Sequence, residues 1–144
     1  MEVLAIRPQG FCKGVLRAIG IVEKALRDPG VPKPLYILGM IVHNRHVVDD
    51  LEKKGAITLD LADGPFLEQL SRLEKGSVVV AAHGIDDHIK DSAAGMGFSI
   101  IDATCFDVAR SKSLVRARLN DGYVVLYIGK KDHPEADSAL SLGS

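Results

Sequence analysis

The chain has 144 residues, enough for one ordinary domain with a buried core. It has 26% charged residues with a formal net charge of −1, and 5% aromatic residues with no Trp, so it lacks the basic surface and the stacking side chains typical of nucleic-acid binders. No apolar run is long enough to cross a bilayer. The N-terminus lacks the basic start of a signal peptide and the two cysteines are far apart, so we expect a cytoplasmic protein without a nucleic-acid or membrane partner.

Cys12 follows the first predicted strand. The apolar residues 3–6 predict a short buried strand that ends at a Pro-Gln-Gly turn, and a helical pattern of apolar residues runs from near Gly14 to Arg27. Because unpaired N–H groups and the helix dipole favour negative charge at a helix N-terminus, a cysteine here is biased toward thiolate, the form that binds metals or attacks electrophiles. The alternative is a small buried side chain that serves packing alone.

Strands and helices alternate along the rest of the chain. Short apolar runs predict strands at residues 35–38, 56–59, 77–82, 98–101 and 123–128. Helices are expected at residues 45–54, 65–73, 86–94 and 108–119, with at most a short helix after residue 136. This alternation predicts an α/β fold with mainly parallel sheets built from repeated βα units. We expect a complete first unit at residues 1–95 and a truncated second unit at residues 96–144.

Reactive side chains follow the predicted strands. In open parallel sheets, ligands bind beyond the carboxyl ends of the strands. The side chains just past the strands are Cys12, His43, His83, Cys105 and His133. The sequence therefore predicts one shared rim of two cysteines and three histidines, with the carboxylate of Glu135 beside it as a candidate proton donor.

The rim residues permit more than one chemistry. Their spacing matches no local zinc motif, but widely spaced cysteines are compatible with an iron–sulfur cluster, although two thiolates are fewer than such a cluster normally needs. Imidazoles at strand ends beside helix N-termini can bind a phosphate or diphosphate. Each histidine could instead be an ordinary core or surface residue, and for His46 and His88, inside predicted helices, that interpretation is favoured.

A weak internal repeat supports the shared rim. Cys12, Val15 and Arg17 have the same spacing as Cys105, Val108 and Arg110, and each set begins after a predicted strand. Two matched units of this kind would place two thiolates on one rim, although so short a similarity can also arise by coincidence.

Five motifs resemble one enzyme family. In chain order they are Pro-Gln-Gly-Phe-Cys12-Lys-Gly-Val, Ile-Val-His43-Asn-Arg-His-Val-Val-Asp, Ala-Ala-His83-Gly, Asp-Ala-Thr-Cys105 and Ile-Gly-Lys-Lys-Asp-His133-Pro-Glu135. They resemble the successive motifs of the 4-hydroxy-3-methylbut-2-enyl diphosphate reductases, the LytB family, which end the non-mevalonate isoprenoid pathway.

The resemblance implies a function for each rim residue. It implies a [4Fe–4S] cluster with Cys12 and Cys105 as two of its three cysteine ligands, and a diphosphate held by His43, His83 and His133. Glu135 matches the acid that feeds protons to the substrate. The implied reaction is reductive dehydroxylation to isopentenyl and dimethylallyl diphosphates, with a ferredoxin or flavodoxin as electron donor.

The resemblance covers the N-terminal half of the family's pattern. The third cysteine, a third α/β unit and the Ser/Asn-rich segment that completes the family's diphosphate pocket have no counterpart in these residues. Phe106 stands where a proline usually follows the second cysteine, and Ala136-Asp-Ser replaces the usual residues after His-Pro-Glu. Two alternatives therefore stay open. One is a non-catalytic remnant or diphosphate-binding module, and the other is a thiol-based redox or structural metal protein on the same scaffold.

Overall fold

A four-stranded parallel sheet forms the centre of the protein. The computed structural model describes residues 4, 10–131 and 133–143. The strands are β1 (Leu35–Leu38), β2 (Ala56–Leu59), β3 (Ser77–Val80) and β4 (Ser99–Asp102), in the order β2-β1-β3-β4. All three pairings are parallel, with Leu38 opposite Val80 and Val80 opposite Asp102. The predicted α/β class is confirmed.

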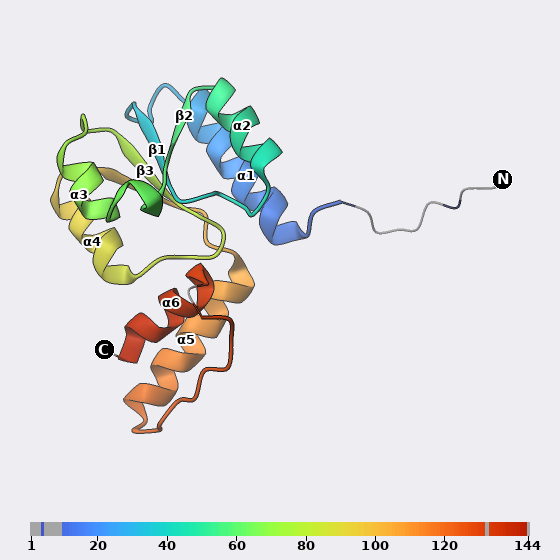
Figure 1. The fold of residues 1–144 in the computed structure, drawn as a ribbon, viewed down its shortest axis with the longest axis vertical. Helices are drawn as coiled ribbons and strands as arrows, with labels where there is room; N and C mark the ends of the chain where they lie inside the picture. Colours follow the sequence, from blue (N-terminus) through green and yellow to red (C-terminus); the bar gives the residue numbers. More distant parts are fainter. Residues whose placement is uncertain (1–3, 5–9, 132, 144) are drawn as a thin grey trace.

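Helices cover both faces of the sheet (Figure 1). Helices α1 (Lys13–Arg27) and α2 (Arg45–Lys53) pack on one face, and α3 (Phe66–Ser71) and α4 (Asp87–Gly95) pack on the other. Every residue of the two central strands, β1 and β3, is buried, which explains their unbroken apolar sequences. Two apolar clusters result, one around Ile37 and Val79 beneath α1, and one around Tyr36 and Val78 beneath α3 and α4.

The C-terminal helices extend from the carboxyl edge of the sheet. Three residues separate the end of β4 from helix α5 (Phe106–Asn120), and α6 (Pro134–Leu140) packs against α5 (Figure 1). Two short 3₁₀ helices, η1 (Leu61–Asp63) and η2 (Ser141–Gly143), complete the described elements. None of the helices in the described ranges is long and apolar enough to span a membrane.

One predicted strand is wrong. Residues 123–128 form no strand, and Val124, Leu126 and Ile128 are 89%, 85% and 98% exposed. Val125 and Tyr127 line a small pocket together with residues of α5 and α6. A strand also needs a hydrogen-bonded neighbour, and residues 10–131 and 133–143 place none beside this segment.

Other predicted boundaries moved by a few residues. The predicted strand at residues 77–82 ends at Val80, and the helix expected at residue 108 begins at Phe106. The strand expected at residues 3–6 lies outside the described residues. Strand β4 belongs to the same sheet as β1–β3, and the division into units at residues 95 and 96 stays a prediction.

Candidate active site at the carboxyl edge of the sheet

Backbone hydrogen bonds align three loops at the carboxyl edge of the sheet. The Ala82 N–H donates to the Ile41 carbonyl at 3.2 Å, and the Cys105 N–H donates to the Ala82 carbonyl at 2.8 Å. The parallel register therefore continues past the ends of β1, β3 and β4. Residues His43, His83 and Cys105, one on each loop, are brought to the same rim.

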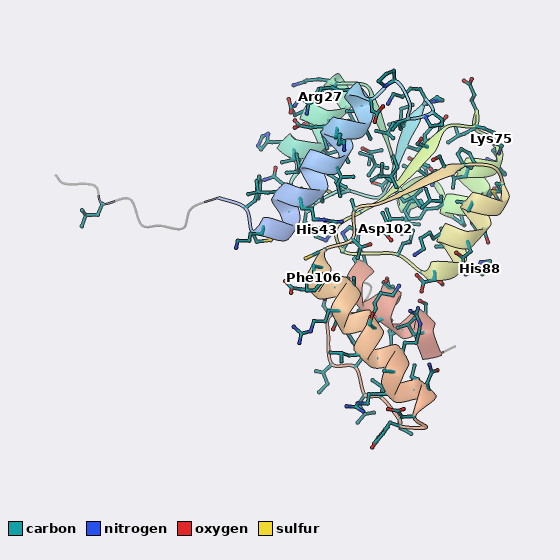
Figure 2. All side chains as sticks on the ribbon, turned by 180° about the vertical axis from the view of Figure 1, so that it is seen from behind. Arg27, His43, Lys75, His88, Asp102 and Phe106 are labelled. Carbon is teal, nitrogen blue, oxygen red and sulfur yellow. The ribbon has the colours of Figure 1, made fainter. Side chains whose placement is uncertain are left out.

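Three imidazoles converge at this rim. The His43 ring stacks on the His83 ring with centroids 5.2 Å apart, and its centroid lies 5.5 Å from that of the tilted His133 ring. Figure 2 shows His43 at the junction between the sheet and α5, while His88 lies away from it on α4. His46 is exposed in the first turn of α2, outside the ring cluster.

The environment of His83 keeps its ring neutral. Burial, followed by the positive charges that His43 and His133 can carry, lowers the pKa of His83 from 6.5 to about 4. Three clustered imidazoles repel one another when protonated, and a bound anion would reverse that effect. The cluster is therefore suited to a ligand with negative charge.

Helix α6 brings His133 to the other two histidines. The Ser138 hydroxyl, buried beneath the helix, donates to the Ile85 carbonyl at 2.9 Å and ties α6 to the loop that carries His83. Gly84 has a φ of +77°, and a Cβ there would lie 3.1 Å from the Ser138 hydroxyl oxygen. A glycine at this position therefore allows both the positive φ of the turn and the close packing of α6 against it.

Glu135 lies in the first turn of α6. Its backbone N–H donates to His133 Nδ1 at 3.3 Å, an arrangement that leaves the Nε2 of a neutral His133 carrying the proton. The carboxylate makes no hydrogen bond or ion pair with the described residues. Glu135 is half-buried, two residues after His133.

The two cysteines occupy equivalent positions. Cys12 is the N-cap residue of α1 and Cys105 is the N-cap residue of α5, and neither side chain forms a capping hydrogen bond. A Cβ added to Gly14 would lie 3.8 Å from the Cys12 sulfur and 2.5 Å from the Cys105 sulfur. Both sulfurs therefore lie close to one point beside α1, as the repeat predicts.

A pocket of about 420 Å³ opens beside the histidines. Its polar lining includes His43 and His83 together with three carboxylates, Asp60, Asp86 and Asp137. Its apolar lining comes from the end of β1 and the loop after it, from η1 and α3, and from the loop before α4 and the first turn of that helix, through Leu38, Met40, Leu61, Phe66, Ile85 and Ile89. Mainly apolar walls with a few polar groups are typical of a small-molecule binding site.

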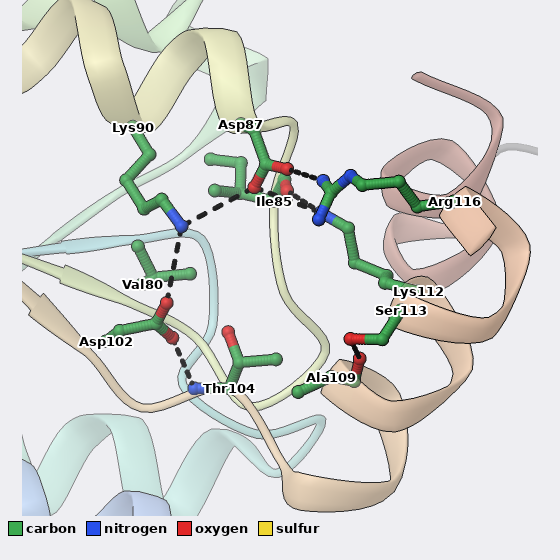
Figure 3. Close-up of a pocket in the computed structure, with 10 residues that line it drawn as sticks. All are labelled: Val80, Ile85, Asp87, Lys90, Asp102, Thr104, Ala109, Lys112, Ser113 and Arg116. Carbon is green, nitrogen blue, oxygen red and sulfur yellow. Dashed lines mark hydrogen bonds and ion pairs between the residues drawn. The ribbon is translucent and has the colours of Figure 1, made fainter. Parts of the chain in front are cut away.

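A second, charged pocket of about 190 Å³ lies between α4, β4 and α5 (Figure 3). Asp87 pairs with Lys112 at 3.3 Å and Arg116 at 2.5 Å, and Lys112 also donates to the Ile85 carbonyl at 2.9 Å. Burial alone would raise the pKa of Asp87, but these cations and Lys90 lower it below its ordinary value. Its charges are paired with one another, and these contacts anchor α5 to the start of α4 and to the loop before it.

Sequence reasoning missed the residues that secure the rim. Asp87 and Lys112 are 25 residues apart, and Ser138 is one serine in a polar helix. No spacing rule links such positions, because their contacts depend on how α5 and α6 pack. The described residues include no group of three or more Cys, His, Asp or Glu side chains arranged to hold a metal ion.

Comparison with known proteins identifies the family. The family model described as "LytB protein" matches residues 3–144. The chain belongs to the LytB family. The 4-hydroxy-3-methylbut-2-enyl diphosphate reductase of Symbiobacterium thermophilum is 46% identical over 142 residues, which are 99% of this chain and 48% of that protein. The corresponding enzyme of Anoxybacillus flavithermus is 47% identical over 99% of this chain and 44% of its own length.

Solved structures of LytB proteins share the fold. The (E)-1-hydroxy-2-methylbut-2-enyl 4-diphosphate reductase of Plasmodium falciparum superposes with a TM-score of 0.79 at 36% identity, over 94% of this chain and 40% of that one. A second structure, of the reductase that is the terminal enzyme of the non-mevalonate pathway, gives 0.77 at 30% identity, over 92% and 44% of the two chains. The chain thus spans about half the length of the relatives it matches.

Proposed function

We propose that this chain forms the first part of a 4-hydroxy-3-methylbut-2-enyl diphosphate reductase, an oxidoreductase of isoprenoid synthesis. The observation that carries the proposal is the convergence of His43, His83 and His133, together with the meeting of the free thiols of Cys12 and Cys105 beside Gly14. The names of the LytB relatives and the five motifs support the same reaction.

The histidines would hold the diphosphate of the substrate. His83 is neutral near pH 7, so it would bind an anion as a hydrogen-bond donor. The more exposed His43 lies beside it and could make a second contact. The apolar walls of the adjoining pocket suit a five-carbon chain. Glu135 would supply protons from the first turn of α6.

The thiols fit two positions of an iron–sulfur cluster. They are unpaired N-cap side chains at two helix N-termini, and Gly14 leaves space between them that a Cβ would fill. When bound, a [4Fe–4S] cluster would supply the electrons that remove the substrate hydroxyl, and a ferredoxin or flavodoxin would replenish them. Since this sequence contains two cysteines, a third thiolate must come from outside it.

A second candidate function is diphosphate binding without reduction. The histidine cluster and the pocket beside it lie within the described residues, whereas the thiol pair alone is short of a cluster site. We expect the isolated chain, reconstituted anaerobically with iron and sulfide, to hold a cluster poorly. A stoichiometric [4Fe–4S] cluster with turnover in this chain alone would contradict that expectation.

Calorimetry tests the function shared by both candidates. Titration of the chain with 4-hydroxy-3-methylbut-2-enyl diphosphate should release heat that is lost in His43→Ala and in His83→Ala. The control is His46→Ala, an exposed histidine outside the ring cluster, which should bind as the unsubstituted chain does. Absence of binding at millimolar ligand, or equal binding by all variants, would refute the assignment of the rim.

A further inference from the structure

Arg17 links the two helices that carry the thiols. Its Nη1 donates to the Thr104 carbonyl at 3.0 Å, across 87 residues of sequence. Arg17 lies on α1, five residues after Cys12, and Thr104 directly precedes Cys105. Each end of this hydrogen bond is therefore close in the chain to one of the two cysteines.

The turn before Cys105 is held from two directions. On the sheet side, the Thr104 N–H donates to the Asp102 carboxylate at 2.9 Å, and the Cys105 N–H donates to the Ala82 carbonyl at 2.8 Å. On the other side, the Arg17 guanidinium is the only hydrogen-bond or ion-pair connection between α1 and residues 103–110 within the described ranges. The hydrogen bonds to Asp102 and Ala82 hold the turn against the sheet, and the hydrogen bond from Arg17 holds it against α1.

The internal repeat separates this role from that of an ordinary surface arginine. Arg110 occupies the same place after Cys105 that Arg17 occupies after Cys12, and both side chains are exposed. Arg110, however, forms no hydrogen bond or ion pair with any residue that the structure describes. Sequence spacing makes the two arginines equivalent, whereas the structure distinguishes them. Arg110 is thus a matched control.

We propose that Arg17 is a positioning residue that holds the Cys105 thiol opposite the Cys12 thiol, so that both can bind one soft metal centre. The proposal rests on the proposed function, in which these thiols are cluster ligands. Arg17 itself donates to a backbone carbonyl and acts on the thiol pair through the peptide that joins Thr104 to Cys105. Removing its guanidinium leaves both thiols intact but frees the turn from α1.

Cadmium binding to the reduced 144-residue chain reads out the thiol pair directly, because Cd²⁺ is a soft ion that prefers thiolates and its thiolate bonds absorb in the ultraviolet. We expect Arg17→Ala to bind Cd²⁺ about fivefold more weakly, which is the size of effect that one charged hydrogen bond exposed to solvent supports. Arg17→Lys, which keeps a donor, should bind within about twofold of the unsubstituted chain, as should Arg110→Ala.

The outcomes distinguish this proposal from the proposed function. Diphosphate calorimetry on Arg17→Ala should be unchanged, since it reports the histidines. Failure to bind diphosphate would overturn the substrate assignment without affecting the cadmium result. Unchanged cadmium affinity in Arg17→Ala, equal loss in Arg110→Ala, or no dependence on Cys12→Ser and Cys105→Ser would overturn the role of Arg17.

Discussion

Substituting Gly14 with alanine should separate the stability of the fold from the geometry of the thiol pair. The added Cβ would lie 2.5 Å from the Cys105 sulfur, so the sulfur must move by about 1 Å to restore an ordinary contact. Alanine also favours a helix over glycine by about 1 kcal/mol, and Gly14 lies in the first turn of α1. We therefore predict that Gly14→Ala unfolds no more easily than the unsubstituted chain but binds Cd²⁺ about tenfold more weakly.

Gly20 provides the control for this substitution. It lies on the same helix, and a Cβ there would meet nothing within 4 Å. Gly20→Ala should raise the free energy of unfolding by about 0.5–1 kcal/mol and leave cadmium affinity unchanged. Urea denaturation and ultraviolet titration of the three chains measure both quantities. Unchanged cadmium affinity in Gly14→Ala would refute the inference that the two sulfurs share the space beside this residue.

Three further predictions concern stability. Asp87→Asn should lower the free energy of unfolding by about 1 kcal/mol in urea denaturation, because it removes the carboxylate that pairs with two cations of α5. Asp91→Asn, at an exposed residue one turn later in the same helix, should change it little. Leu35→Ala, at a fully buried side chain, should lower the free energy of unfolding by about 2–5 kcal/mol in the same assay. Leu126→Ala, at a side chain that is 85% exposed, should lower it by less than about 0.5 kcal/mol, and a large loss of stability there would contradict its exposure. The pKa of His83 falls from 6.5 to about 4 on folding, so the unfolded chain binds more protons than the folded chain between these pH values. The free energy of unfolding should therefore fall by about 1–2 kcal/mol as the pH drops from 6.5 to 4, a range that allows for the partial exposure of the ring. His83→Gln should flatten that part of the stability–pH profile.

The sequence predicts those features that depend on local pattern. The apolar run that begins at Ser77 predicts a buried central strand, and β3 is buried throughout. Because parallel strands share one carboxyl edge, the positions of His43 and His83 after their strands were sufficient to predict that they meet. The N-cap position of Cys12 likewise follows from where the apolar pattern of α1 begins.

Features that depend on contacts between distant parts of the chain could not be predicted from the local sequence pattern. Residues 123–128 have the unbroken apolar sequence and the β-branched and aromatic composition of a strand, but strand formation depends on a neighbour that the segment itself cannot specify. The bond from Arg17 to Thr104 and the space beside Gly14 arise from the angle at which α1 and α5 meet. Neither leaves a signal in the spacing of residues along the chain.

Nuclear magnetic resonance of the histidine side chains tests the central claim most directly. The chain has five histidines, of which three form the ring cluster and two, His46 and His88, lie exposed on α2 and α4. On addition of 4-hydroxy-3-methylbut-2-enyl diphosphate, we predict that the imidazole resonances of His43, His83 and His133 shift together while the other two stay in place. Shifts at His46 or His88 alone, or at none of the five, would contradict a diphosphate site at the rim.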